Sequence, residues 1–435
     1  MSELRFESFT MPAAVIGGLN PHGRIQMKSG DDAPLREFDP GIDPDDMRDP
    51  AYGYRKNCLP YRLQDQFDCG RQPRAFEAAV LENDRLRALF LPELGGRLWS
   101  LLDKRTGREL LHVNPEFRPG NLALRNAWFS GGVEWNFCWR GHTPFTCDPL
   151  FVATARLDDG TPVLRMYEFE RVRGIPYQMD FFLPDGAATL FARMAIRNPD
   201  ARTVPVYWWS NIAVPEHSRH RVLTPADSVL RFNYLRMKMN LHPNPVLGGR
   251  DLSYPTNHPT ACDNFYVIPD GRQAWIATVD ESGRGLFQTS TKTLRGRKLF
   301  VWGQSQRGRN WQDFLNTPGH PYVEIQAGIE RTQMTCRPLP PGESFEWLEA
   351  YGLLETDPAI AHGRDWERAT GHAAAHIAEI VPQHTMEKTL ERTRAMSTGA
   401  PRDVVRMASG WGALERLRRE KSGERPFCGP ALPFP

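Results

Sequence analysis

The sequence has no excess of charge of either sign. Its 54 Lys and Arg residues stand against 52 Asp and Glu residues, which leaves a formal net charge of +2. Proteins that bind nucleic acid or a membrane surface through electrostatic attraction need a field of one sign. The balance therefore argues against nucleic-acid and membrane partners, and it favours a neutral ligand over a phosphorylated or uronic one.

Paired cysteines and long apolar runs are also missing. The seven cysteines are an odd number without a C-x-x-C pair, so the pattern supports neither a disulfide framework nor a zinc site. No run of eighteen apolar residues occurs, and the N-terminus offers no convincing signal-peptide cleavage site. We expect a cytoplasmic protein with mostly reduced thiols.

Motifs for nucleotide binding and for serine hydrolases are absent as well. The sequence contains no G-x-x-x-x-G-K-S/T loop, no G-x-G-x-x-G that enters a helix after a strand, and no G-x-S-x-G elbow. Nucleotide-dependent and serine-hydrolase functions are therefore unsupported, and no cofactor is predicted.

Glycine, proline and tryptophan are abundant instead. The chain has 36 Gly, 37 Pro and 12 Trp among 435 residues, without any low-complexity period. Gly and Pro disfavour helix interiors, and turn signals such as Asp-Gly recur along the chain at roughly eight-to-twelve-residue spacing, which is typical of an all-β sandwich or barrel. The fold class is therefore predicted to be all-β.

The texture of the chain changes twice. Residues 1–72 are rich in Pro, Gly and Asp and predict an N-terminal extended arm, mostly irregular, wrapped on the main body. Residues 73–356 carry the strand and turn pattern. Residues 357–435 are rich in Ala, His, Arg and Glu and predict a helical C-terminal tail, in which a repeat array could begin.

The richest candidate segment is residues 126–149. Trp faces stack on the C–H faces of sugar rings, and a carboxylate between apolar neighbours is expected to have a raised pKa, the condition that a general acid requires. A structural interpretation stays open, because alternating aromatics often form core. The candidates here are Trp128, Glu134, Trp135, Trp139 and His142.

A second candidate segment is residues 299–333. Glu324 stands in the middle of an apolar predicted strand, and Gln326 falls on the same strand face because side chains alternate. Trp302 and Trp311 lie nearby in sequence. Glu324 is either a surface position of the sheet or the partner of Glu134, since two carboxylates in an aromatic cleft suffice for chemistry at an anomeric carbon.

A third segment, residues 207–227, could line the same cleft with Trp208 and Asn211. It continues into Glu216, His217 and His220, but H-x-x-H in a loop lacks the geometry of a helix-borne zinc motif. We therefore predict no metal there, and exposed loop histidines are at least as good an interpretation.

The order of these segments resembles a bacterial domain family of uncharacterised function. The resemblance is carried by LPELGGRLWSLLDKRTGREL, WFSGGVEWNF, YWWSNIAV, VWGQSQRGRNWQ, PYVEIQAG and GWGALE. That family looks like a galactose-mutarotase-type β-supersandwich whose members often continue into tetratricopeptide repeats. The resemblance implies a fold shared by aldose 1-epimerases, several glycoside hydrolases and phosphorylases, and polysaccharide lyases, but it does not imply one reaction.

Within that resemblance, Glu324 looks like the general base of true mutarotases. The paired mutarotase histidines have no match here, and Glu134 would supply an acid. The leading hypothesis is therefore hydrolysis of a neutral oligosaccharide or glycoside by Glu134 and Glu324. The alternatives are an aldose 1-epimerase with Glu324 as base, or a non-catalytic carbohydrate-binding module. The oligomeric state is left open, a homo-oligomer included.

Overall fold

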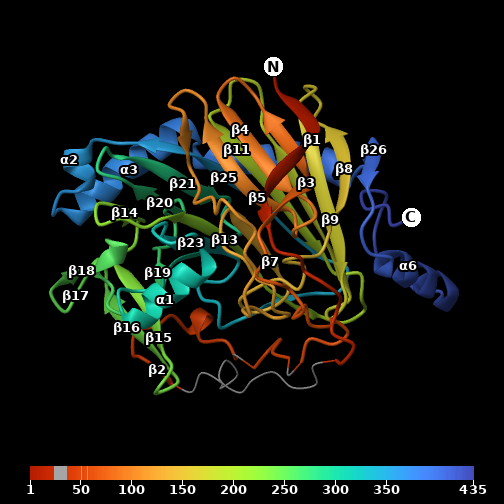
Figure 1. Ribbon diagram of the computed structural model, residues 1–435, viewed down its shortest axis with the longest axis horizontal. Coiled ribbons are helices and arrows are strands. Elements are labelled where there is room, and N and C mark those ends of the chain that lie inside the picture. Colours follow the sequence, from red (N-terminus) through yellow and green to blue (C-terminus); the bar gives the residue numbers. More distant parts are fainter. Residues whose placement is uncertain (24–36, 50, 56) are drawn as a thin grey trace.

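The computed structural model describes residues 1–23, 37–49, 51–55 and 57–435 (Figure 1). Two large sheets pack face to face, and all their strand pairings within these ranges are antiparallel except the short β2–β16 pair. Helices gather at the C-terminal end of the chain. The all-β prediction with a helical C-terminal tail is confirmed.

The larger sheet has thirteen strands among the described residues. In spatial order these are β1 (Glu3–Ala13), β3 (Gln72–Glu82), β4 (Leu86–Leu91), β5 (Arg97–Asp103), β7 (Val133–Phe137), β13 (Trp208–Pro215), β23 (Tyr322–Gly328), β22 (Gly296–Val301), β19 (Cys262–Val267), β15 (Ser228–Asn233), β16 (Lys238–Pro243) and β2 (Glu37–Phe38), with β6 (Arg108–Glu109) paired to β5.

The second sheet has nine strands in the same ranges. Their spatial order is β14 (Arg221–Leu223), β20 (Trp275–Val279), β21 (Arg284–Ser290), β25 (Ser344–Glu355), β11 (Thr189–Arg197), β10 (Ile175–Phe182), β9 (Pro162–Glu170), β8 (Phe151–Arg156) and β26 (Asp403–Arg406). Two small ribbons pair β12 (Val204–Val206) with β24 (Arg337–Leu339), and β17 (Val246–Leu247) with β18 (Arg250–Asp251).

The helices are short. They are α1 (Gln306–Leu315), α2 (Pro358–Ala361), α3 (Trp366–Ile380), α4 (Gln383–Arg392), α5 (Arg394–Thr398) and α6 (Trp411–Ser422), with 3₁₀ turns η1 (Pro44–Asp46) and η2 (Pro255–Asn257). None of the helices in the described ranges is long and apolar enough to cross a membrane.

The main core lies between the two sheets. Phe90 of β4 meets Phe181 of β10 with ring centroids 4.6 Å apart, and Trp208 of β13 meets Trp347 of β25 at 5.1 Å. These contacts join one sheet to the other, so the aromatic residues that alternate along these strands act as core.

The C-terminal tail covers the outer face of the second sheet. Ala369, Ala373 and Ile377 of α3 are buried together with Val279 and Leu348 of that sheet. In Figure 1, α2 and α3 lie beyond β14 and β20, whereas α6 lies on the side of β8 and β9. The tail therefore completes the sandwich as a third layer.

The N-terminal arm differs from the expectation at its start. Residues Glu3–Ala13 form an eleven-residue edge strand of the large sheet, paired along its length with β3. The pairing partner lies about seventy residues away, and few β-branched residues mark the segment, so local patterning did not reveal this strand. The seven cysteines are all free in the structure.

Candidate functional site

A cavity of about 380 Å³ opens on the face of the large sheet that points away from the core. Its floor comes from β13, β23, β22 and β19, where Asn211 pairs with Gln326 and Gln326 with Lys298 across neighbouring strands. Directly paired residues share one sheet face. The row from Asn211 to Lys298 therefore presents three polar side chains to the same space.

Aromatic side chains form much of the cavity wall. The aromatic lining consists of Tyr54, Trp128, Trp139, Phe232, Tyr234, Phe300 and Trp302. An apolar wall with a few convergent polar groups is the usual form of a small-molecule site, and flat rings suit the C–H faces of sugars.

Glu134 lies behind this wall and does not line the cavity. Its side chain is 3% exposed and accepts hydrogen bonds from Trp128 Nε1 at 3.1 Å, His142 Nδ1 at 2.7 Å and Thr146 Oγ1 at 2.8 Å. The guanidinium of Arg97 is 3.6 Å away. Every polar neighbour of the carboxylate is thus a donor or a cation.

These neighbours fix the ionisation of Glu134. Burial alone would raise its pKa, but the charges of His142 and Arg97 and the hydrogen bonds from His142 and Trp128 outweigh burial and lower the pKa to about 2. The expectation of a raised pKa and a general-acid role is therefore wrong for Glu134. A carboxylate that stays ionised at neutral pH cannot donate a proton there.

His142 connects Glu134 to the cavity. Its Nδ1 bonds to Glu134, and its ring packs 5.2 Å from Trp128 and lines the cavity. The side chain is 27% exposed, and no hydrogen bond to Nε2 occurs among the described residues. Because Nδ1 donates to a carboxylate, Nε2 is left to exchange a proton with a ligand.

Glu324 lines the cavity from β23, two strands from Glu134 on β7. Its Oε2 accepts a hydrogen bond of 2.7 Å from Gln326 Nε2. Burial raises the pKa of Glu324, with Glu134 adding to the rise, while His142 and Lys298 oppose it. The two carboxylates therefore differ: Glu134 is held ionised, whereas Glu324 binds a proton more readily than an exposed Glu.

A polar network fixes the floor beside Glu324. Gln333 donates to Gln326 Oε1 at 2.9 Å and accepts from Lys298 Nζ at 2.6 Å. Lys298 also pairs with Asp263 at 2.7 Å. The network orients the amide of Gln326, so that its nitrogen faces Glu324.

Two buried polar atoms in the cavity wall have no hydrogen-bond partner within the described ranges. They are Asn211 Oδ1, an acceptor, and Trp302 Nε1, a donor. Buried polar atoms normally find partners, which makes Asn211 and Trp302 candidate ligand contacts.

The structure brings together seven of the eleven residues predicted from the sequence. Those that line the cavity are Trp128, Trp139, His142, Asn211, Trp302, Glu324 and Gln326. Trp311 does not line it but stacks behind Trp302 at 5.8 Å.

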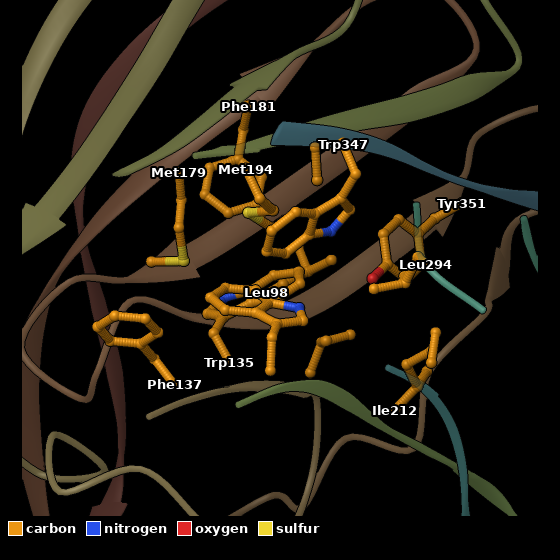
Figure 2. Close-up of a cluster of buried hydrophobic side chains, with 14 of the residues drawn as sticks. Leu98, Trp135, Phe137, Met179, Phe181, Met194, Ile212, Leu294, Trp347 and Tyr351 are labelled. Atoms are coloured by element: carbon orange, nitrogen blue, oxygen red, sulfur yellow. The ribbon is translucent and has the colours of Figure 1, made fainter. Parts of the chain in front are cut away.

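The prediction that Trp135 and Trp208 line the sugar cleft is wrong. Both are buried between the sheets, and Figure 2 shows Trp135 among Leu98, Phe137 and Trp347. They project from β7 and β13 on the side opposite to Glu134 and Asn211, because residues an odd number apart on a strand face opposite ways.

Several site residues were missed by sequence reasoning. They are Arg97, Thr146, Asp263, Lys298 and Gln333. Lys298 follows Arg295 and Arg297 directly before the apolar run LFVW, so the sequence does not single it out from these neighbours. For Arg97 and Thr146 no local signal exists, because their role comes from contacts between distant segments.

The loop after β13 forms no metal cluster. His217 is exposed and Glu216 is buried, with hydrogen bonds of 3.2 Å from both Gln304 and Gln312. Burial raises the pKa of Glu216 to about 7. Nowhere in the described ranges do three or more His, Cys, Asp or Glu side chains gather so that they could hold a metal ion.

Comparison with known structures finds the same fold elsewhere. A crystal structure of a TPR-domain containing protein from Parabacteroides distasonis matches with a TM-score of 0.65 at 20% identity, covering 81% of this chain and 55% of that one. The present chain thus spans about half the length of that protein.

Weaker likenesses extend to two further crystal structures. A galactose mutarotase-like protein from Clostridium acetobutylicum matches at 11% identity and a TM-score of 0.48, covering 64% of this chain and 95% of that one. A putative aldose 1-epimerase from Escherichia coli K12 matches at 14% identity and a TM-score of 0.43, covering 63% and 97%.

The sequence also matches the model of a protein family. The domain of unknown function DUF5107 matches residues 55–341, which is more than half of the chain and contains the whole cavity floor. The family expected from the order of the motifs is thereby confirmed, and the chain belongs to the DUF5107 family.

Proposed function

We propose that the cavity binds a sugar and interconverts its anomers, with Glu324 as general base and His142 as general acid. One observation carries the proposal: Glu324 and a His142 anchored by Glu134 line the same aromatic-walled cavity. This arrangement favours the aldose 1-epimerase alternative over the hydrolase hypothesis, which needed Glu134 as its proton donor.

Anomer interconversion requires two proton transfers on one ring. Glu324 removes the proton of the anomeric hydroxyl, and the electron pair forms the C1=O1 bond as the bond from C1 to the ring oxygen breaks. Protonated His142 gives its Nε2 proton to that ring oxygen. After rotation about C1–C2 the steps run in reverse on the other carbonyl face, and both groups regain their starting protonation.

The environments of the two groups suit these roles. Burial raises the pKa of Glu324, so its carboxylate is a better proton acceptor than an exposed Glu. Glu134 stays ionised and accepts the hydrogen bond from His142 Nδ1, which orients Nε2 toward the cavity. Glu134 acts through His142 and is therefore a positioning residue.

The rest of the cavity supports a ring with several hydroxyls. Trp128 and Trp302 offer aromatic faces, and Asn211 Oδ1 and Trp302 Nε1 offer an unpaired acceptor and donor. A sugar carries several hydroxyls that donate and accept, so it can satisfy an acceptor and a donor. A ligand without hydroxyls would leave both atoms unpaired.

The test is NMR exchange spectroscopy between the α and β anomer signals of a panel of reducing sugars. The wild type is expected to accelerate exchange for at least one of them, and Glu324→Gln to lower that rate about 10²- to 10⁴-fold. Glu216→Gln is the matched control, because Glu216 is also buried with a raised pKa but lies outside the cavity.

The same protein is assayed for release of aryl glycosides. Release that depends on Glu134 would restore the hydrolase hypothesis. Sugar binding without exchange or release would instead identify a binding module. Either result contradicts the proposed function.

A further inference from the structure

A second hollow of about 400 Å³ adjoins the cavity. It is lined by Tyr54, Arg55, Asn57, Leu59, Arg171 and Val172. Tyr54 and Arg55 line both spaces, so the two lie side by side. A ligand that extends from the cavity past Arg55 enters the second hollow.

The second hollow is cationic. Of the residues that the structure describes, the charged ones lining it are two arginines and no carboxylate. Among the described residues neither Arg55 nor Arg171 forms an ion pair, although many of the other arginines do. The cavity itself adds Arg140, Arg173 and Lys298 against Asp263 and Glu324. The joined space has five formal positive charges from Arg and Lys and two negative ones.

Arg171 is held in place by aromatic rings and also interacts electrostatically with Glu168. Its guanidinium carbon lies 3.8 Å from the ring centroid of Tyr61 and 5.1 Å from that of Trp411, at the start of α6. Stacking fixes the plane of the guanidinium, and beyond its hydrogen bond to Tyr61 it keeps further N–H donors for a ligand. Arg55, the other arginine of the hollow, is exposed.

We infer that the ligand carries an anionic group, a carboxylate or a phosphate, which binds between Arg55 and Arg171 while the anomeric ring occupies the cavity. Arg forks bind both groups through paired hydrogen bonds, and local charge rather than the net charge of +2 decides ligand choice. The inference rests on the proposed function and replaces the expectation of a neutral sugar with an acidic one.

The experiment is titration calorimetry with galactose, galacturonate and glucose 6-phosphate as probes. Wild type is expected to bind one or both anionic sugars at least tenfold more tightly than galactose, and increasingly weakly as salt rises. The galacturonate and glucose 6-phosphate arms distinguish a carboxylate from a phosphate.

Substitutions of the two arginines test where the anionic group of the ligand binds. Arg55→Gln and Arg171→Gln are each expected to weaken binding of anionic sugars about tenfold and to weaken binding of galactose much less. Arg219→Gln, at an exposed arginine outside both hollows, is the matched control. If Arg171→Gln fails to fold because it loses the contacts to Tyr61 and Trp411, exposed Arg55 still decides the matter.

The inference and the proposed function fail in different ways. Equal affinity for neutral and anionic sugars, or equal loss of both in Arg55→Gln, overturns the inference even if anomers are interconverted. Arg55-dependent binding of acidic sugars without anomer exchange overturns the proposed function and leaves the inference standing. Absence of binding by all three probes overturns the inference.

Discussion

Replacing Glu134 with Gln tests the assignment of this residue as a buried anchor. The carboxylate accepts from Trp128, His142 and Thr146 and neighbours Arg97, so all four contacts are donors or cations. An amide nitrogen in place of one oxygen cannot accept. At least one donor loses its partner, and Arg97 loses the neighbouring charge.

The cost follows from the burial of Arg97, which is 2% exposed. Removing one partner of a buried ion pair typically costs about 3 to 5 kcal/mol. Arg97 keeps the carbonyl oxygens of Phe129 and Gly131 at 3.3 and 3.0 Å, and His142 can turn toward solvent. We therefore expect the lower end, a loss of about 3 kcal/mol in the free energy of unfolding.

The assay is guanidinium chloride unfolding followed by tryptophan fluorescence. Thr146→Val is the matched control, since it removes one hydrogen bond to the same carboxylate without the charge and should cost about 1 kcal/mol. In folded Glu134→Gln, anomer exchange should fall about 10²-fold because His142 loses its anchor. Stability within about 0.5 kcal/mol of wild type, together with unchanged exchange, would refute the reasoning.

Three further outcomes are expected. Between pH 4 and pH 8, the free energy of unfolding of Glu216→Gln should rise by about 3 kcal/mol relative to that of wild type in denaturation experiments. The reason is that the pKa of Glu216 is raised to about 7 in the folded protein, so protonated Glu216 stabilises the wild type at low pH and this stabilisation is lost as pH rises through 7. A pH-independent difference would contradict this. Trp302→Phe should weaken sugar binding about tenfold by calorimetry, whereas Trp311→Phe, behind it, should not. Gly328→Ala should lower stability by roughly 3 kcal/mol in thermal melts, because a Cβ there would lie 2.2 Å from the Trp209 ring; an unchanged melting temperature would count against the packing.

The fold was predictable because its signals are local. Turn residues at short intervals and alternating apolar positions indicate β-structure wherever they occur, and the loss of both after Pro358 marks the helical tail. Glu324 and Gln326 were placed correctly on one strand face from their spacing of two.

The same rule would have excluded two tryptophans. Glu134 and Trp135 are adjacent on a strand and cannot face one cleft, and Trp208 is three positions from Asn211. The sequence-based prediction placed both residues in the cleft because their segments are rich in tryptophan, and it did not apply the spacing rule. The structure assigns both tryptophans to the core between the sheets.

The ionisation of Glu134 could not be predicted. Its pKa is set by Arg97 from β5 and by His142 from the loop after β7, and only the folded chain brings these charges to one carboxylate. The hollow between Arg55 and Arg171 likewise joins segments more than a hundred residues apart. The net charge of the whole chain averages over such local sites, and for that reason it led to the expectation of a neutral ligand.

The central claim is that Glu324 and His142 act together on one sugar ring. The most direct measurement is the anomer exchange rate of wild type, Glu324→Gln, His142→Gln and the double variant on the same sugar. We expect each single variant to lose about 10²-fold or more in exchange rate, and the double variant to be little slower than the worse single one. A wild-type rate in either single variant would contradict the claim.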